Sequence, residues 1–188
     1  MSSTPTTTPT TTASLPAGTW TIDPTHTRIG FVARHMMVTK VRGSFSEFSA
    51  EVEIAEHPFE SKLSAEVQMA SIDTGSADRD GHLRTNDFFD IEQYPTMQLV
   101  ATGFEGSGDS YVMHADLTIK GVTKPVAFEI EFDGVGQDPW GVTRAGFTAT
   151  TTINRKDWGV EWNAPLETGG VLVGEKIQIE LDVQLVKS

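Results

Sequence analysis

Apolar and polar residues alternate along most of the chain from Thr19 onward. Between Phe48 and Ile54, for example, apolar Phe, Ala, Val and Ile positions are separated by Ser and Glu. A period of two is typical of a β-strand with one buried face and one solvated face. The pattern therefore predicts a protein built from strands.

Eight segments show this alternation, and short Gly-containing stretches at 105–109 and 120–124 predict hairpin turns between consecutive strands. The predicted strands are 28–35, 48–54, 63–69, 97–104, 111–120, 126–132, 143–153 and 177–185. Eight antiparallel strands joined by hairpins close most simply into an up-and-down barrel. A two-sheet sandwich is the alternative architecture. The fold class predicted is all-β, an eight-stranded antiparallel barrel.

Residues 76–95 break the alternation, with Leu83 lying five residues before Phe88 and Phe89. This segment predicts a short helix, laid across one end of the barrel. A connection this long in a compact barrel is usually functional or forms a lid.

The predicted inner face contains many small residues, among them Ala50, Ala65, Ala101 and Ala115. An eight-stranded barrel can be filled by its own side chains or can hold one small ligand. Small inward residues can simply fit the taper of the barrel, or they can leave volume for an apolar guest. Both interpretations remain open on the pattern alone.

The composition narrows the class of protein. Residues 1–16 are nearly all Thr, Pro, Ser and Ala, which predicts a disordered tail before a single domain over 17–188. That tail has neither the basic nor the apolar region of a signal peptide, and no run of 18 apolar residues follows, so we expect a cytoplasmic protein without stable membrane insertion. The absence of Cys excludes thiolate metal sites. A net charge of −12 argues against nucleic acid as a partner.

Candidate chemistry is sparse. The five histidines show no metal-ligand spacing, and neither a nucleophile elbow nor a phosphate-binding loop is present, so we predict no catalytic residue, no metal and no cofactor. The densest polar cluster contains Arg79, His82 and Arg84. These cations could contact a carboxylate or pyrophosphate head group, or they could lock the segment by pairing with its own Asp residues.

Several motifs in this order and spacing resemble the YceI-like family of lipocalin-like, polyisoprenoid-binding proteins, over about Thr19 to Lys187. The motifs are Trp20, Asp23 and His26, then Phe31 and His35, then 41–45, 79–90, Tyr94 and Pro95, 117–123 and 153–159. The resemblance implies an extended barrel that holds a long isoprenoid, such as a polyprenyl pyrophosphate or a quinone tail, for transport or storage. It also implies a homodimer.

Combined with the alternation, the resemblance predicts which apolar residues contact the lipid in the barrel interior. They are Phe31, Ala33, Phe48, Val52, Ala65, Val67, Met69, Leu99, Met113, Ala115, Leu117, Phe128, Ile130, Phe132, Ile179 and Leu181. Possible head-group contacts are Arg79, His82 and Arg84. The alternatives are a small lipid-modifying enzyme that uses the Arg79–Arg84 cluster, and a filled structural or partner-binding domain.

Overall fold

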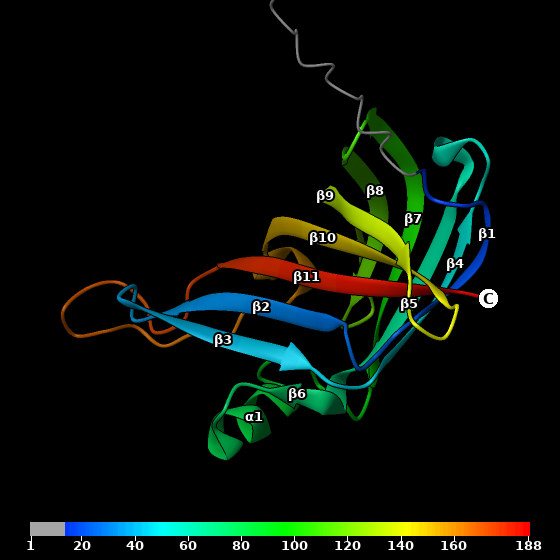
Figure 1. Ribbon diagram of the computed structural model, residues 1–188. Coiled ribbons are helices and arrows are strands. Elements are labelled where there is room, and N and C mark those ends of the chain that lie inside the picture. Colours follow the sequence, from blue (N-terminus) through cyan, green and yellow to red (C-terminus); the bar gives the residue numbers. More distant parts are fainter. Residues whose placement is uncertain (1–13) are drawn as a thin grey trace, which may run out of the picture.

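Eight antiparallel strands form a closed barrel in the computed structural model, which describes residues 14–188 (Figure 1). The part of the predicted tail before Ser14 lies outside the described residues. Around the ring the barrel strands are β1 (Gly18–Ile22), β4 (Phe48–Ile54), β5 (Lys62–Gln68), β7 (Thr96–Ser107), β8 (Ser110–Ile119), β9 (Val122–Gln137), β10 (Thr143–Asn154) and β11 (Lys176–Lys187). Because β1 pairs with both β4 and β11, the sheet closes on itself. The predicted eight-stranded barrel is confirmed, and the two-layer sandwich is not what forms.

Three further strands, β2 (Arg28–His35), β3 (Thr39–Phe45) and β6 (Ile72–Asp73), extend the sheet from β11. β11 has two neighbours on one side, since β2 pairs with its first half and β1 with its last residues. The alternation predicted β2 correctly, but it missed β1, β3 and β6, and β1 rather than β2 is the eighth strand of the ring. β1 and β6 are too short to show a period, and in β3 the alternation is interrupted at Gly43, where a Cβ would overlap the Phe31 ring.

Both predicted hairpins are present. β7 and β8 meet at a turn whose flanking pair is Ser107 and Ser110. β8 and β9 are joined by Lys120 and Gly121 alone, and both residues have positive φ, 50° and 74°. Two successive positive φ values define the type I′ turn that matches the twist of an antiparallel pair.

The segment between β5 and β7 contains the predicted helix, α1 (Ala77–Arg84), and the 3-10 turn η2 (Met69–Ser71). Two other 3-10 turns, η1 (Pro58–Glu60) and η3 (Arg155–Trp158), lie before β5 and after β10. The Ser76 side chain caps α1 by accepting from the backbone N–H of Arg79. The helix is polar, and its segment is anchored by Phe88, which is buried against Leu117 and Trp158. The segment therefore lies over one end of the barrel, which we name the α1 end.

The apolar side chains gather in four clusters along the barrel. One, around Phe88 and Trp158, occupies the α1 end; another, around Trp20, occupies the opposite end, named here the Trp20 end. A central cluster around Phe128 shares Leu99 with the first and Leu63 with the second, so the apolar interior is continuous from end to end. The fourth, around Phe45 and Met69, lies under β3 and β6. Within residues 14–188, none of the helices is both long and apolar enough to cross a membrane.

Candidate functional site

The predicted interior residues lie opposite one another across neighbouring strands. Ala65 pairs with Leu99, Leu99 with Leu117, and Phe31 with Ile179. Residues paired in this way share one face of the sheet. Every predicted interior residue except Ala33 and Ala65 belongs to one of the four apolar clusters or packs against it.

The interior residues divide into two groups by exposure. The buried ones are Val52, Val67, Met69, Met113, Ala115, Leu117 and Phe128. The half-buried ones are Phe31, Ala33, Phe48, Ala65, Leu99, Ile130, Phe132, Ile179 and Leu181. An apolar side chain that lies on the inner face and is still half-buried borders space that a water-sized sphere can enter. The second group therefore presents apolar surface that the protein itself does not cover.

Arg79 and Asp80 both contact Thr74, which lies just before α1. The Arg79 guanidinium donates to the Thr74 hydroxyl at 2.7 Å and to its carbonyl at 2.6 Å. The buried Asp80 carboxylate accepts from the backbone N–H of Thr74 at 3.0 Å and from its hydroxyl. Because two residues of α1 hold the same threonine, these contacts fix the helix to the residue that directly follows β6.

His82 and Arg84, the other two head-group candidates, also have partners within this segment. His82 Nε2 lies 2.8 Å from an Asp87 carboxylate oxygen, and its ring packs edge-on against Phe88 and Trp162. One Arg84 nitrogen donates to the carbonyl oxygens of Ala70 and Ile72. These contacts match the locking interpretation of the cluster, although the Asp pairing is made by His82 alone.

Two cations outside the predicted site residues lie close to the interior. Arg155 is buried, and its guanidinium donates to the backbone carbonyls of Val160, Val173 and Gly174. Burial lowers the pKa of Arg155, whereas the negative charge of Glu175 acts in the opposite direction. Since a guanidinium remains charged in proteins, Arg155 places a positive charge inside the α1 end.

Lys124 is the second such cation. It pairs with the inward-facing Leu117 across β8 and β9, so it occupies an inner position, yet its side chain is exposed. An interruption of the apolar alternation at residue 124 was its only signal in the sequence.

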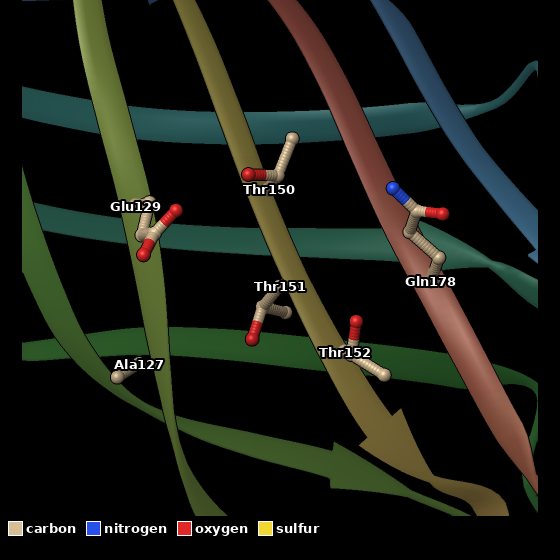
Figure 2. A pocket seen from close by; sticks show the side chains of 6 residues that line it. All are labelled: Ala127, Glu129, Thr150, Thr151, Thr152 and Gln178. Atoms are coloured by element: carbon tan, nitrogen blue, oxygen red, sulfur yellow. The ribbon is translucent and has the colours of Figure 1, made fainter.

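A recess of about 360 Å³ lies at the place where β9 and β10 separate. Figure 2 shows six side chains that line it. The ladder between these strands ends at the pair Glu129 and Thr150. Apart from Ala127, the lining is polar: Glu129, Thr150, Thr151, Thr152 and Gln178. A polar, open recess does not suit an apolar chain, so this surface is distinct from the apolar interior.

Residues 14–188 show no group of three His, Asp or Glu side chains placed to hold a metal ion. The site is therefore described by its apolar inner face, by the locked α1 segment over one end, and by the two cations at that end.

Comparison with known proteins places these features in a family. The YceI-like domain model matches residues 20–185. A UPF0312 protein from Photorhabdus laumondii is 41% identical over 134 residues, which cover 71% of this chain and 70% of that protein. A UPF0312 protein from Staphylococcus aureus is 36% identical over 167 residues, covering 88% of this chain and 95% of its own.

Two solved structures share the fold. BcnA from Burkholderia cenocepacia superposes with a TM-score of 0.74 at 22% identity, covering 87% of this chain and 98% of that one. A structure described as a polyisoprenoid binding domain from Saccharophagus degradans, implicated in plant cell wall breakdown, gives 0.69 at 14% identity and covers 90% and 98%. At these identities the likeness establishes the barrel architecture.

Proposed function

This chain belongs to the YceI-like family, and we propose on that premise that its barrel binds a long isoprenoid lipid and carries or stores it. The observation that carries the proposal is the row of half-buried apolar side chains on the inner face, which includes Phe48, Leu99 and Leu181. Apolar surface inside a barrel attracts an apolar guest, because burying it removes hydrocarbon from water on both sides.

Small residues support the proposal at mid-barrel. Ala50 pairs with Ala65 across β4 and β5, and Ala101 pairs with Ala115 across β7 and β8. Three of these alanines, Ala50, Ala65 and Ala101, are half-buried and leave apolar surface uncovered on one wall of the interior, whereas Ala115 is buried. The structural relative described as a polyisoprenoid binding domain suggests which apolar guest would use such space. An isoprenoid quinone and a polyprenyl pyrophosphate both fit this description.

The expected affinity follows from the size of the guest. Drug-sized ligands gain at most about 0.3 kcal/mol per heavy atom, so the upper bound for a prenyl chain of roughly 40 atoms is about −12 kcal/mol. This free energy corresponds to a dissociation constant near the nanomolar level. A guest bound this tightly should remain in the barrel during purification.

Mass spectrometry of an organic extract of the purified protein tests the proposal. We expect an isoprenoid at a stoichiometry near one per chain after expression in a host that makes prenyl lipids. The extract of an unrelated barrel, prepared in parallel, controls for lipid carried over from the host membrane. Protein that is recovered empty and that does not take up added polyprenol would rule out lipid carriage and favour a filled structural domain. Turnover of added polyprenyl pyrophosphate would favour the enzyme alternative.

A further inference from the structure

Positive charge is concentrated in one short stretch of this acidic chain. Residues 24–46 contain Arg28, Arg34, Lys40 and Arg42 and neither Asp nor Glu, although the whole chain has 26 acidic and 14 basic residues. With His neutral, this stretch carries +4 in a protein whose net charge is −12, so the remainder carries −16. The stretch corresponds to β2, β3 and the turn that joins them.

The four cations lie on the same face of the β2–β3 ribbon. Even-numbered positions of β2 pair with even-numbered positions of β3, and Arg34 lies directly opposite Lys40. Like charges at directly opposed positions of an antiparallel pair repel each other. Arg42 forms an ion pair with Glu180 at 3.4 Å. Within the described part of the chain, neither Arg34 nor Lys40 forms an ion pair. An anionic partner would relieve this repulsion.

The turn between the two strands exposes three apolar side chains in succession. Met36, Met37 and Val38 are 44%, 60% and 74% exposed. Met36 and Met37 have φ of 53° and 59°, and the Val38 N–H donates to the His35 carbonyl at 3.0 Å, which defines a type I′ turn. Asn and Gly are the residues that adopt this turn without strain. Two methionines held there, in water, indicate a role that favours apolar side chains at this position.

The hairpin is held in a fixed position beside the barrel. Met36 N–H donates to the Leu172 carbonyl at 2.8 Å, and Gly174 N–H donates to the Arg34 carbonyl at 2.9 Å. In Figure 1 the β2–β3 hairpin and the connection before β11 extend together beyond the barrel. That connection, residues 159–175, contains three acidic residues, Glu161, Glu167 and Glu175, so the attraction for an anion comes from the hairpin and not from the segment beside it.

We propose that the β2–β3 hairpin docks the protein on the surface of a bilayer that contains anionic lipids. Met36, Met37 and Val38 enter the boundary between head groups and acyl chains, and Arg34 and Lys40 contact lipid phosphates. The acidic remainder of the molecule is repelled by the same surface, so the protein approaches with the hairpin first. This inference goes beyond the proposed function, since it concerns a surface outside the barrel and holds whatever the barrel contains.

The size of the apolar turn favours a bilayer over a second copy of the chain. A stable protein interface buries about 800 Å² on each partner, which exceeds what three side chains at a turn supply. A symmetric pair of hairpins would also bring two basic faces together, and like charges across an interface oppose association. A bilayer requires only a few anchoring side chains and a basic flank.

Vesicle binding tests the proposal, using the full chain and vesicles free of isoprenoids, so that the result does not depend on cargo. We expect cosedimentation with vesicles of phosphatidylcholine and phosphatidylglycerol, weakening as salt rises, and little with phosphatidylcholine alone. Lys40→Ser should weaken the binding roughly fivefold, as expected for one basic residue at an anionic surface. The matched control is Lys62→Ser, on the exposed start of β5, which should leave binding unchanged.

A second variant and its matched control test how much the apolar side chains contribute to vesicle binding. Met37→Asp should abolish binding, whereas Trp140→Asp, at an exposed tryptophan between β9 and β10 at the Trp20 end, should retain it. Sedimentation velocity without vesicles tests whether the hairpin instead binds a second copy of the chain. Failure to bind anionic vesicles at low salt, equal losses in Lys40→Ser and Lys62→Ser, or a dimer that Met37→Asp dissociates would each overturn bilayer docking, and the last would identify a second copy as the partner.

Discussion

The Asp23 carboxylate lies in the turn after β1 and links that turn to β10 and β11. It accepts hydrogen bonds from Arg144 at 2.8 Å and from Gln184 at 3.0 Å, and from the Thr25 hydroxyl at 2.7 Å. The Nδ1 atom of His26 lies 2.9 Å from an Asp23 carboxylate oxygen, and the Asp23 side chain is only 12% exposed. Hydrogen bonds from Thr25 and His26 hold the pKa of Asp23 well below its ordinary value of 3.8.

A lowered pKa makes a prediction about acid stability. The ionised form of Asp23 stabilises the folded state above the unfolded pKa, and this contribution is lost as the pH falls below about 4. Asp23→Asn should therefore have a lower melting temperature than the wild type at pH 7, and the difference should shrink as the solution is acidified. Thermal unfolding between pH 7 and pH 2 measures both. Asp109→Asn, in the exposed β7–β8 turn, is the control, and a difference for Asp23→Asn that does not change with pH would contradict the argument.

Single residues were predictable from the sequence where their role depends on period, and not where it depends on distant partners. The inner face could be read from the alternation because successive strand residues point to opposite sides. Asp23 and Arg155 could not, since their partners lie up to 161 and 19 positions away along the chain. Burial of an arginine among carbonyl oxygens leaves no trace in the local pattern.

Long strands were easier to predict from the sequence than short ones. All eight predicted strands form, most with bounds shifted by a few residues, although β9 begins four residues earlier than predicted and includes Pro125. A proline is unfavourable inside a strand because it cannot donate a backbone hydrogen bond to the ladder. Over residues 122–128, however, β9 has β8 as its partner and no pairing to β10, so one side of the strand needs no donor.

The α1 segment carries the prediction that distinguishes locking from head-group binding. Arg84 donates to the carbonyls of Ala70 and Ile72, so Arg84→Ala should remove the link between α1 and η2. Hydrogen bonds from charged groups contribute about 1.5–3 kcal/mol, and partial exposure here favours the lower end of that range. The loss of stability should be accompanied by equal weakening for a prenyl pyrophosphate and its uncharged prenol.

Fluorescence titration with both ligands, together with thermal unfolding, decides between the two roles. Arg79→Ala should behave like Arg84→Ala, because its guanidinium is fixed to Thr74. Selective weakening for the pyrophosphate, without a change in melting temperature, would instead assign Arg84 to the head group. Lys124→Ala is the informative companion variant, since it removes an inner cation that does not hold α1.

At the scale of the molecule, the ring closes through its shortest strand. β1 has five residues and bridges β4 and β11, and the fully buried Trp20 ring packs against Val52 and Leu185 of those two strands. The barrel could be predicted from the number and spacing of strands, but its closing pair could not, because the β2–β3 excursion separates β1 from β4 along the chain. The packing of Trp20 therefore joins the two strands between which β1 closes the ring.

Two alanines on the inner face test whether that interior holds a guest. Ala65 is half-buried between Ala50 and Leu99, outside the apolar clusters, whereas Ala115 is 1% exposed and packs with Met113 and Phe128. Ala65→Phe should fill open space, so the extract should contain less lipid while the melting temperature of the empty protein stays unchanged. Ala115→Phe should overpack a filled region and cost about 1–3 kcal/mol. Thermal unfolding and lipid content of both variants give the comparison. If Ala65→Phe destabilises the protein as much as Ala115→Phe and releases no lipid, the wall at Ala65 is already filled, and the barrel carries nothing there.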